Sequence, residues 1–200
     1  MPVARKPRNK KQPTTQASSA LPDRRVMESY LAAITGAKQD EAIERAQEMI
    51  YDAWEQRTSR SRVALARKAL AISPLCADAY NLLAGEAASP AEAREFYERG
   101  LAAAELVLGR EGFEEYAGQF WGFLETRPYM RARRGLAITL LQAGEEDAAI
   151  GHLRAMLELN PGDNQGIRYV LLATLLRRDE IEAAKTLLAA YEEDWSNEWL

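Results

Sequence analysis

The chain has 200 residues, which suits one extended repeat array or one to two compact domains. A hydrophobic fraction of 47% can fill a core, and the lone cysteine, Cys76, excludes an internal disulfide and a multi-cysteine metal site. No run of about 18 apolar residues and no apolar signal core are present, so we expect no membrane span and a cytoplasmic location.

Residues 1–25 are strongly basic. They hold seven Lys or Arg residues and one acid, a net charge of +6, while the rest of the chain has −10. Residues 1–22 contain almost nothing to bury, which predicts a disordered basic tail. Such a tail is either a solvated extension or a binder of nucleic-acid phosphates. It has no aromatic residue to stack on bases, which weakens the nucleic-acid alternative.

Three helices are predicted before Pro74, because apolar residues recur there at helical spacing. They span residues 23–35, 39–56 and 59–72, and Gly36 ends the first of them. Together they form the amino-terminal half of the helical part.

Internal repetition begins around two prolines. The string LAISPLCADAYNLLA contains Pro74, and the similar string LELNPGDNQGIRYVLLA contains Pro161. If each proline ends a repeat, Asp78 and Asp163 lie near the starts of new helices, where a carboxylate can cap the helix or complement its dipole. The distance between the prolines exceeds two standard repeat lengths, so an irregular segment must lie between them.

A helical pair is predicted from about Ala77 to Ala104. Its turn has Ser89 as a side-chain cap, Pro90 at the first helical position and Glu92 placed to reach back. These signals predict a new helix that starts at Pro90.

Residues 105–127 break the regular pattern, with four glycines and a dense group of aromatic residues. We expect a short helix near 113–118, followed by an aromatic turn. The aromatic side chains either form an exposed anchor for a partner or pack as a satellite core, and the core is favoured. They are Phe113, Tyr116, Phe120, Trp121 and Phe123.

The stretch from Met130 to Pro161 is a nearly complete helix–turn–helix repeat. It has apolar residues at helical spacing, a glycine break, a small residue where the two helices touch and a closing proline. A unit of this kind must stack on its neighbours to bury its apolar face. Its markers are Leu136, Ala137, Leu140, Gly144, Ala149, Leu153, Met156 and Pro161.

A last unit is predicted from about Asn164 to residue 190. The chain then ends in YEEDWSNEWL, whose Tyr191, Trp195 and Trp199 suit a cover for the final apolar face. The same aromatic residues offer a surface for self-association.

These units resemble the tetratricopeptide-repeat family over about two thirds of the chain. The strings FWGFLETRPYMRAR and NPGDNQGIRYVLL also resemble a bacterial subgroup of repeat proteins distantly like the suppressor-of-tumorigenicity-7 family. The first resemblance implies an all-α, right-handed superhelical solenoid over residues 23–200, with a concave groove lined by the first helix of each pair. Arg133 replaces the bulky aromatic residue of the family pattern, so the resemblance is incomplete there.

The resemblance also implies a non-catalytic scaffold or adaptor that binds a peptide or protein segment in this groove. Planar guanidinium groups beside amides suit a carboxylate-bearing partner. Alternatively, the arginines form ion pairs with Glu125, Glu158 or other neighbours and hold the helices together. The second candidate function is a nucleic-acid-associated accessory protein that uses the tail. The predicted partner-binding residues are Asn81, Arg131, Arg134, Gln165, Arg168 and Tyr169.

Catalytic and metal chemistry has little support in the sequence. His152 is the sole histidine, is expected on an exposed helix face and has no cysteine or second histidine to form a metal site. Cys76 stands at a helix start, where the dipole can lower its pKa, but a small buried hydrophobe is the favoured role. We therefore expect no enzyme activity, no cofactor and no bound metal.

Overall fold

The computed structural model describes residues 41–193. The predictions for the basic tail at 1–22 and the helix at 23–35 lie outside the described residues, as do those for Trp195 and Trp199.

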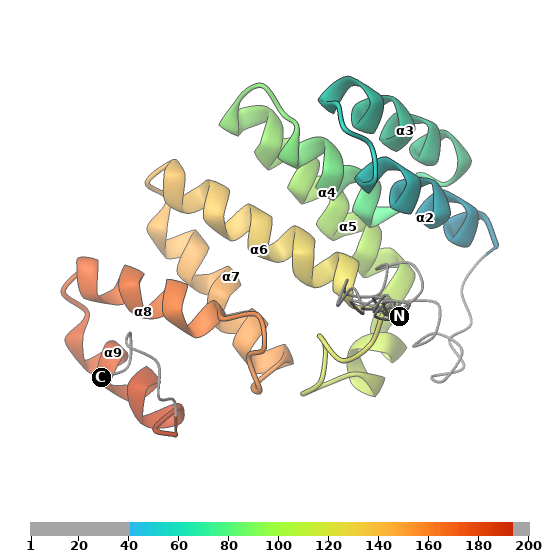
Figure 1. Cartoon of the computed structure of the whole chain (residues 1–200). Helices are drawn as coiled ribbons and strands as arrows, with labels where there is room; N and C mark the ends of the chain where they lie inside the picture. The colour runs from blue at the N-terminus through green and yellow to red at the C-terminus, as the bar shows by residue number, and fades with distance from the viewer. Residues whose placement is uncertain (1–40, 194–200) are drawn as a thin grey trace, which may run out of the picture.

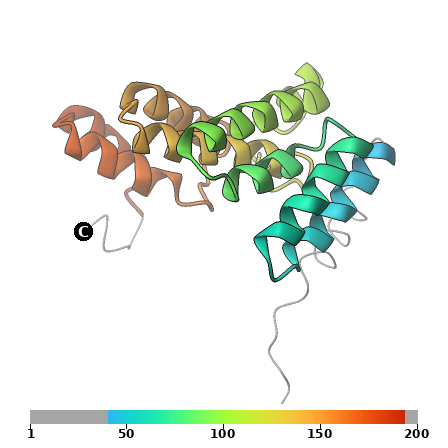
Figure 2. The ribbon, with the colours of Figure 1, turned by 90° about the horizontal axis from the view of Figure 1, so that it is seen from above.

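The described residues form eight α-helices and no strand (Figure 1). Each helix packs against the next one in the chain, and α4 also packs against α2 and α6. Seen from above, the helices follow one another in a row from α2 and α3 at one end to α9 at the other (Figure 2). This order is consistent with a helical repeat. The helices are α2 (Glu41–Trp54), α3 (Ser59–Ile72), α4 (Ala77–Gly85), α5 (Pro90–Glu115), α6 (Arg127–Gln142), α7 (Glu146–Leu159), α8 (Ile167–Arg177) and α9 (Ile181–Ala190).

The start of α5 follows from its local sequence. The Ser89 hydroxyl accepts a hydrogen bond from the backbone N–H of Glu92 at 3.2 Å, and Pro90 occupies the first helical turn. The Glu92 carboxylate reaches back and accepts from the backbone N–H of Ala88 at 2.9 Å. These bonds satisfy donors that have no partner inside the helix, so the predicted helix start is confirmed.

The irregular segment differs in part from the prediction. The helix α5 extends to Glu115, well beyond the predicted end at Ala104, and contains a break at Gly109 with φ 56° and ψ −177°. A residue with a side chain rarely adopts this backbone conformation, whereas glycine does so without a steric cost. The predicted short helix near 113–118 is therefore replaced by the end of α5, which continues after Gly109 to Glu115, and by a turn over residues 116–118.

The aromatic residues after this break belong to the core. Phe120 is fully buried, and its ring centroid lies 5.2 Å from that of Phe113. Phe113 in turn meets Tyr129 of α6 edge-on at 5.1 Å. Offset and edge-to-face contacts of this kind stabilise a core beyond the area they bury. The core alternative is therefore the right one, but the aromatic residues join the main core and do not form a separate satellite.

Two main clusters of buried side chains hold the helices together. One joins α2, α3 and α4 around residues such as Ile50 and Leu82. The other extends from α4 to α9 and includes Tyr129, Leu153 and Leu171. Each helical pair thus buries its apolar face against its neighbours.

Within residues 41–193, no helix is both long and apolar enough to cross a membrane.

Candidate functional site

A buried carboxylate, that of Asp78, links three helices. Asp78 is fully buried in the first turn of α4, and Arg131 of α6 binds it with two parallel hydrogen bonds, Nε to Oδ1 at 2.8 Å and Nη2 to Oδ2 at 2.5 Å. Gln47 of α2 donates to the same carboxylate at 3.2 Å. The predicted role of Asp78 at a helix start therefore comes with a second role, as the partner of an arginine on another helix.

Asn81 completes the contacts of this carboxylate. Its Nδ2 donates to Asp78 Oδ1 and to the backbone carbonyl of Pro128, both at 3.0 Å. Its own Oδ1 is buried and finds no hydrogen-bond partner among the described residues. Both donors of the Asn81 amide are thus used inside the protein, where they join α4 to the start of α6.

The guanidinium of Arg131 also lies over the ring of Trp54, 5.6 Å from its centroid. The Arg131 side chain is 19% exposed. Its Nη1 group makes no hydrogen bond with the described residues, although Nε and Nη2 are both bound to Asp78. We call Gln47, Trp54, Asp78, Asn81 and Arg131 the Asp78 cluster.

A second buried carboxylate begins α8. Asp163 is 3% exposed and has a positive φ of 37°. Its two oxygens accept from the backbone N–H groups of Ile167 and Arg168, at 2.7 and 2.9 Å. These bonds cap the helix, as the sequence predicted. The Arg168 side chain returns to the same carboxylate, with Nη1 2.9 Å from Oδ2.

Two tyrosine rings flank Arg168. Its Nη2 lies 2.6 Å from the Tyr169 hydroxyl, and its guanidinium carbon lies 4.3 Å from the Tyr169 ring centroid and 5.2 Å from that of Tyr191. Burial raises the pKa of Tyr191, and the nearby charge of Asp163 raises it further. These residues form the Asp163 cluster: Asp163, Arg168, Tyr169 and Tyr191.

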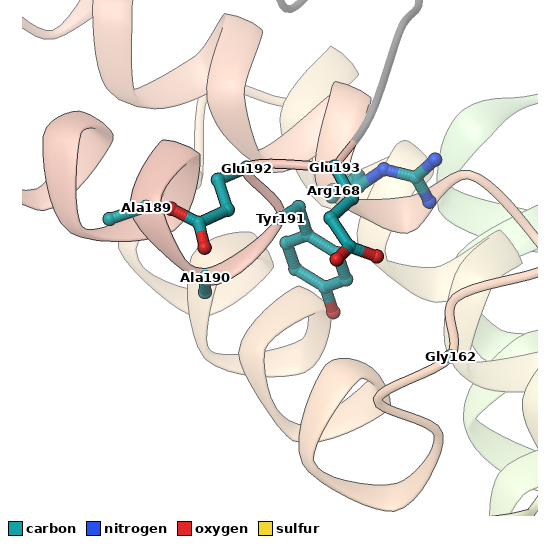
Figure 3. A pocket seen from close by; sticks show the side chains of 7 residues that line it. All are labelled: Gly162, Arg168, Ala189, Ala190, Tyr191, Glu192 and Glu193. Atoms are coloured by element: carbon teal, nitrogen blue, oxygen red, sulfur yellow. The ribbon is translucent and has the colours of Figure 1, made fainter.

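A cavity of about 500 Å³ opens beside this cluster (Figure 3). Its lining consists of Gly162, Arg168 and residues 189–193. The Tyr191 ring lies between Ala189 and Ala190 on one side and Arg168 on the other. The cavity is therefore formed by the start of α8 and the end of α9.

The remaining predicted binding residues lie elsewhere. The helix α8 begins at Ile167 and not near Asn164, so Gln165 lies in the turn before the helix. Its Oε1 is buried and has no hydrogen-bond partner in the described part of the chain. Arg134 is exposed on α6 and forms no ion pair with the described residues. Its charge acts on Tyr97, where it opposes the rise in pKa that burial causes.

The six predicted residues thus fall into separate groups. Asn81 and Arg131 meet at Asp78, whereas Arg168 and Tyr169 meet at Asp163. The ion-pair alternative holds for Arg131 and Arg168, but with Asp78 and Asp163 as partners in place of Glu125 and Glu158. Sequence reasoning did not place Gln47, Trp54 and Tyr191 at these sites.

The sole cysteine and the sole histidine, Cys76 and His152, are both at least partly buried. Cys76 is 1% exposed, and burial, followed by the charge of Asp78, raises its pKa to about 12. The predicted buried role is therefore confirmed. His152 is half-buried and not exposed as expected, and its buried Nδ1 atom has no hydrogen-bond partner among residues 41–193. Across residues 41–193, no group of three or more His, Cys, Asp or Glu side chains is placed to hold a metal ion.

The described residues thus form an all-helical array in which one buried carboxylate, Asp78, pairs with an arginine across α4 and α6, and a second, Asp163, pairs with an arginine at the start of α8. The model of the ST7 protein family matches residues 33–193. The chain therefore belongs to this family, which confirms the ST7-like part of the resemblance. No curated protein and no solved structure matches the chain.

Proposed function

We propose that this protein is a non-catalytic scaffold or adaptor, built as a right-handed solenoid of helical pairs of the tetratricopeptide-repeat type. A peptide or protein segment of the partner binds in the concave groove lined by α2, α4, α6 and α8. The ordered packing of consecutive helices supports this proposal, and so do the contacts of α4 with both α2 and α6. These contacts place α2, α4 and α6 side by side in one layer, which is the arrangement that such a groove needs.

The observation that carries the proposal is the pair of arginines on α6. Arg131 and Arg134 are three residues apart, so their side chains project from the same face of the helix. Asp78 holds the Arg131 guanidinium in place while its Nη1 group stays available, and Arg134 is exposed without an ion pair among the described residues. A preorganised donor loses little conformational entropy on binding, which favours affinity.

The ring of Trp54 lies beside the Arg131 guanidinium. A guanidinium group next to an indole ring provides hydrogen bonds for a carboxylate and apolar area for the chain that carries it. The ligand class is therefore an acidic peptide, or a peptide whose terminal carboxylate is free.

The experiment compares two matched peptide libraries, one with free carboxyl termini and one with carboxamide termini. We expect the wild-type protein to enrich the free-acid peptides. Arg134→Gln is expected to weaken that binding about tenfold or more, because a hydrogen bond to a charged group contributes roughly 1.5–3 kcal/mol.

Arg154→Gln is the matched control. Arg154 is exposed on α7, outside the proposed groove helices, and pairs with no described residue. Equal enrichment of both libraries by the wild-type protein contradicts the carboxylate proposal. Equal losses in the Arg134 and Arg154 variants contradict the groove on α6.

A further inference from the structure

We propose that the exposed face of α3 is a binding surface for the phosphate backbone of a nucleic-acid duplex. Its charged side chains, which we call the α3 basic face, are Arg57, Arg60, Arg67 and Lys68. The helix α3 does not line the proposed peptide groove, so this inference does not depend on the proposed function.

The sequence around α3 contains basic residues and no acid. Residues 56–77 hold five Lys or Arg residues and no Asp or Glu, although the chain after residue 25 has a net charge of −10. Four of the five side chains are exposed. The fifth, Arg62, forms an ion pair with Glu86 and donates to the backbone carbonyl of Gln56 at 3.1 Å. The four exposed charges are therefore the ones that an external ligand can reach.

The exposed charges share one face of the helix. Arg67 and Lys68 lie seven and eight residues after Arg60, which is about two helical turns, so the three side chains project from the same side. Arg57 stands just before the helix, and Ala66 is buried on the opposite side. The helix packs against α2 and α4 and lies at the outer edge of the array (Figure 1). The α3 basic face is thus open to solvent.

None of these four side chains forms an ion pair with another described residue. The arginines of α5 behave differently, because Arg94, Arg99 and Arg110 each pair with a glutamate four residues away. Those charges are neutralised within their own helix. The charges of the α3 basic face have no such partner and repel one another, so a bound anion is favourable there.

The start of α3 adds to this attraction. The positive end of a helix dipole favours an anion close to the first turn. The first turn of α3 contains no acidic residue, and Arg57 and Arg60 lie close to it. Two arginines at this end are unfavourable for the helix alone, whereas a phosphate placed between them interacts favourably with both and with the dipole.

The other side chains of this face indicate which kind of anion fits. The exposed residues between and beyond the charges, Ala64 and Ala71, are small, and the large exposed hydrophobic side chains among the described residues lie on α5, α8 and α9. Protein interfaces depend on aromatic or apolar anchors and are poor in lysine, and a helix on a membrane surface needs large apolar side chains. Contacts with phosphates need only Arg, Lys and close approach.

A duplex fits this face better than a single strand does. The α3 sequence has no aromatic residue on which an unpaired base can stack. From Arg60 to Lys68 the helix rises by about 12 Å, at about 1.5 Å per residue. Each strand of a duplex has one phosphate about every 3.4 Å along the axis, so the face extends over about three or four phosphates.

The test measures the affinity of the full chain for DNA and RNA duplexes of about 20 base pairs, by fluorescence anisotropy between about 50 and 200 mM salt. We expect the wild-type protein to bind at least one duplex, with an affinity that falls steeply as salt is added. The variant Arg60→Gln/Arg67→Gln/Lys68→Gln should bind at least about tenfold more weakly at the lowest salt. Its salt slope should be smaller by about 2 to 3, because each lost phosphate contact removes about 0.9.

The matched control is Arg99→Gln/Arg110→Gln/Arg154→Gln. It loses the same charge at exposed positions of α5 and α7 and should bind almost as the wild-type protein does. Both variants keep the basic residues 1–25, so the contribution of that segment cancels in the comparison. Circular dichroism checks the fold of each variant, and Arg67→Gln/Lys68→Gln replaces the α3 variant if that one unfolds.

Four results overturn the inference. The wild-type protein binds neither duplex at the lowest salt, the α3 variant keeps the wild-type affinity and salt slope, or the control loses as much affinity as the α3 variant does. The fourth is tighter binding of a polyglutamate with the same number of charges, lost in the α3 variant, since this identifies an acidic protein segment as the occupant.

Discussion

Arg131 and Asp78 form a two-pronged ion pair across 53 positions of sequence, with N–O distances of 2.8 and 2.5 Å. The carboxylate is fully buried, whereas the guanidinium lies at the edge of the protein with 19% of its side chain exposed. The pair connects α6 to α4, and Gln47 extends the connection to α2. Arg131, which we propose as a binding residue, therefore also holds α4 and α6 together.

Arg131→Ala is expected to lower the free energy of unfolding by about 3–5 kcal/mol. The substitution leaves a buried carboxylate without its countercharge, and the cost of such an orphaned charge exceeds the net value of the pair. Urea denaturation followed by circular dichroism measures the loss. The Asp78→Asn/Arg131→Met double variant is expected to lose less than the two single losses combined. A loss below about 1 kcal/mol for Arg131→Ala contradicts the structural role.

Substitutions of Arg131 or Arg168 cannot test binding alone, because both arginines also stabilise the fold. Arg168 is fixed to Asp163 as Arg131 is fixed to Asp78, so alanine at both arginines removes the countercharges of two buried carboxylates. A triple alanine variant of Arg131, Arg134 and Arg168 therefore combines loss of binding with loss of stability. Exposed Arg134 is the position that separates the two effects.

The helices were predictable where local signals define them. The predicted range 59–72 is the observed α3, and Ser89, Pro90 and Glu92 placed the start of α5 correctly. Caps and helical spacing act within one turn of the chain, so they are visible in the sequence. The course of α5 past Ala104 was not predictable in this way. Gly109 signals a break, but whether the helix resumes after it depends on how Phe113 packs against Tyr129.

The clusters were less predictable than the helices. Helical spacing places Arg131 on a face of its helix, but it does not identify the residue opposite. Asp78 is far away in sequence, and Glu125 was the nearer candidate. Only the packing of α4 against α6 brings the two charges together. Tyr191 packs against the apolar core, as expected, but its contact with the guanidinium of Arg168 was not visible in the sequence.

Gly135 and Gly151 are expected to respond in opposite ways to alanine. A Cβ atom at Gly135 on α6 overlaps the ring of Tyr97 on α5, whereas one at Gly151 on α7 meets nothing within 4 Å. Gly135→Ala should cost about 1–3 kcal/mol through overpacking. Gly151→Ala should stabilise the protein by about 0.5–1 kcal/mol through helix propensity.

Thermal unfolding of the two glycine variants measures both effects. In a Tyr97→Leu background, Gly135→Ala should lose most of its cost, because the overlapping ring is gone. An undiminished cost in that background refutes the contact as the cause.

Cys76 is expected to resist thiol reagents in the native protein. Its side chain is 1% exposed and its pKa is about 12, so both access and the reactive thiolate are suppressed near neutral pH. Ellman's reagent at pH 8 should label the protein at the rate of unfolding, and fully only in denaturant. Fast stoichiometric labelling without denaturant disagrees with the buried position.

His152 should make the protein less stable in mild acid. Burial lowers the pKa of His152 below its ordinary value of 6.5, Arg133 of α6 lowers it further, and Glu98 of α5 opposes the change. The unfolded chain therefore binds a proton at a higher pH than the folded chain does. The stability that comes from a neutral His152 is present above pH 6.5 and declines as the pH falls below it, toward the folded pKa.

The measurement compares the urea midpoints of the wild-type protein and His152→Gln between pH 7.5 and 5. Carboxylates titrate in both proteins, so the difference between the two curves isolates the histidine. The wild-type midpoint should fall more steeply below pH 6.5, because only the wild-type chain gains a proton on unfolding at this position. If the two curves stay parallel, His152 is not held neutral by burial. If the wild-type protein gains stability relative to the variant, the protonated form has a partner such as Glu98, and the sign of the pKa change is reversed.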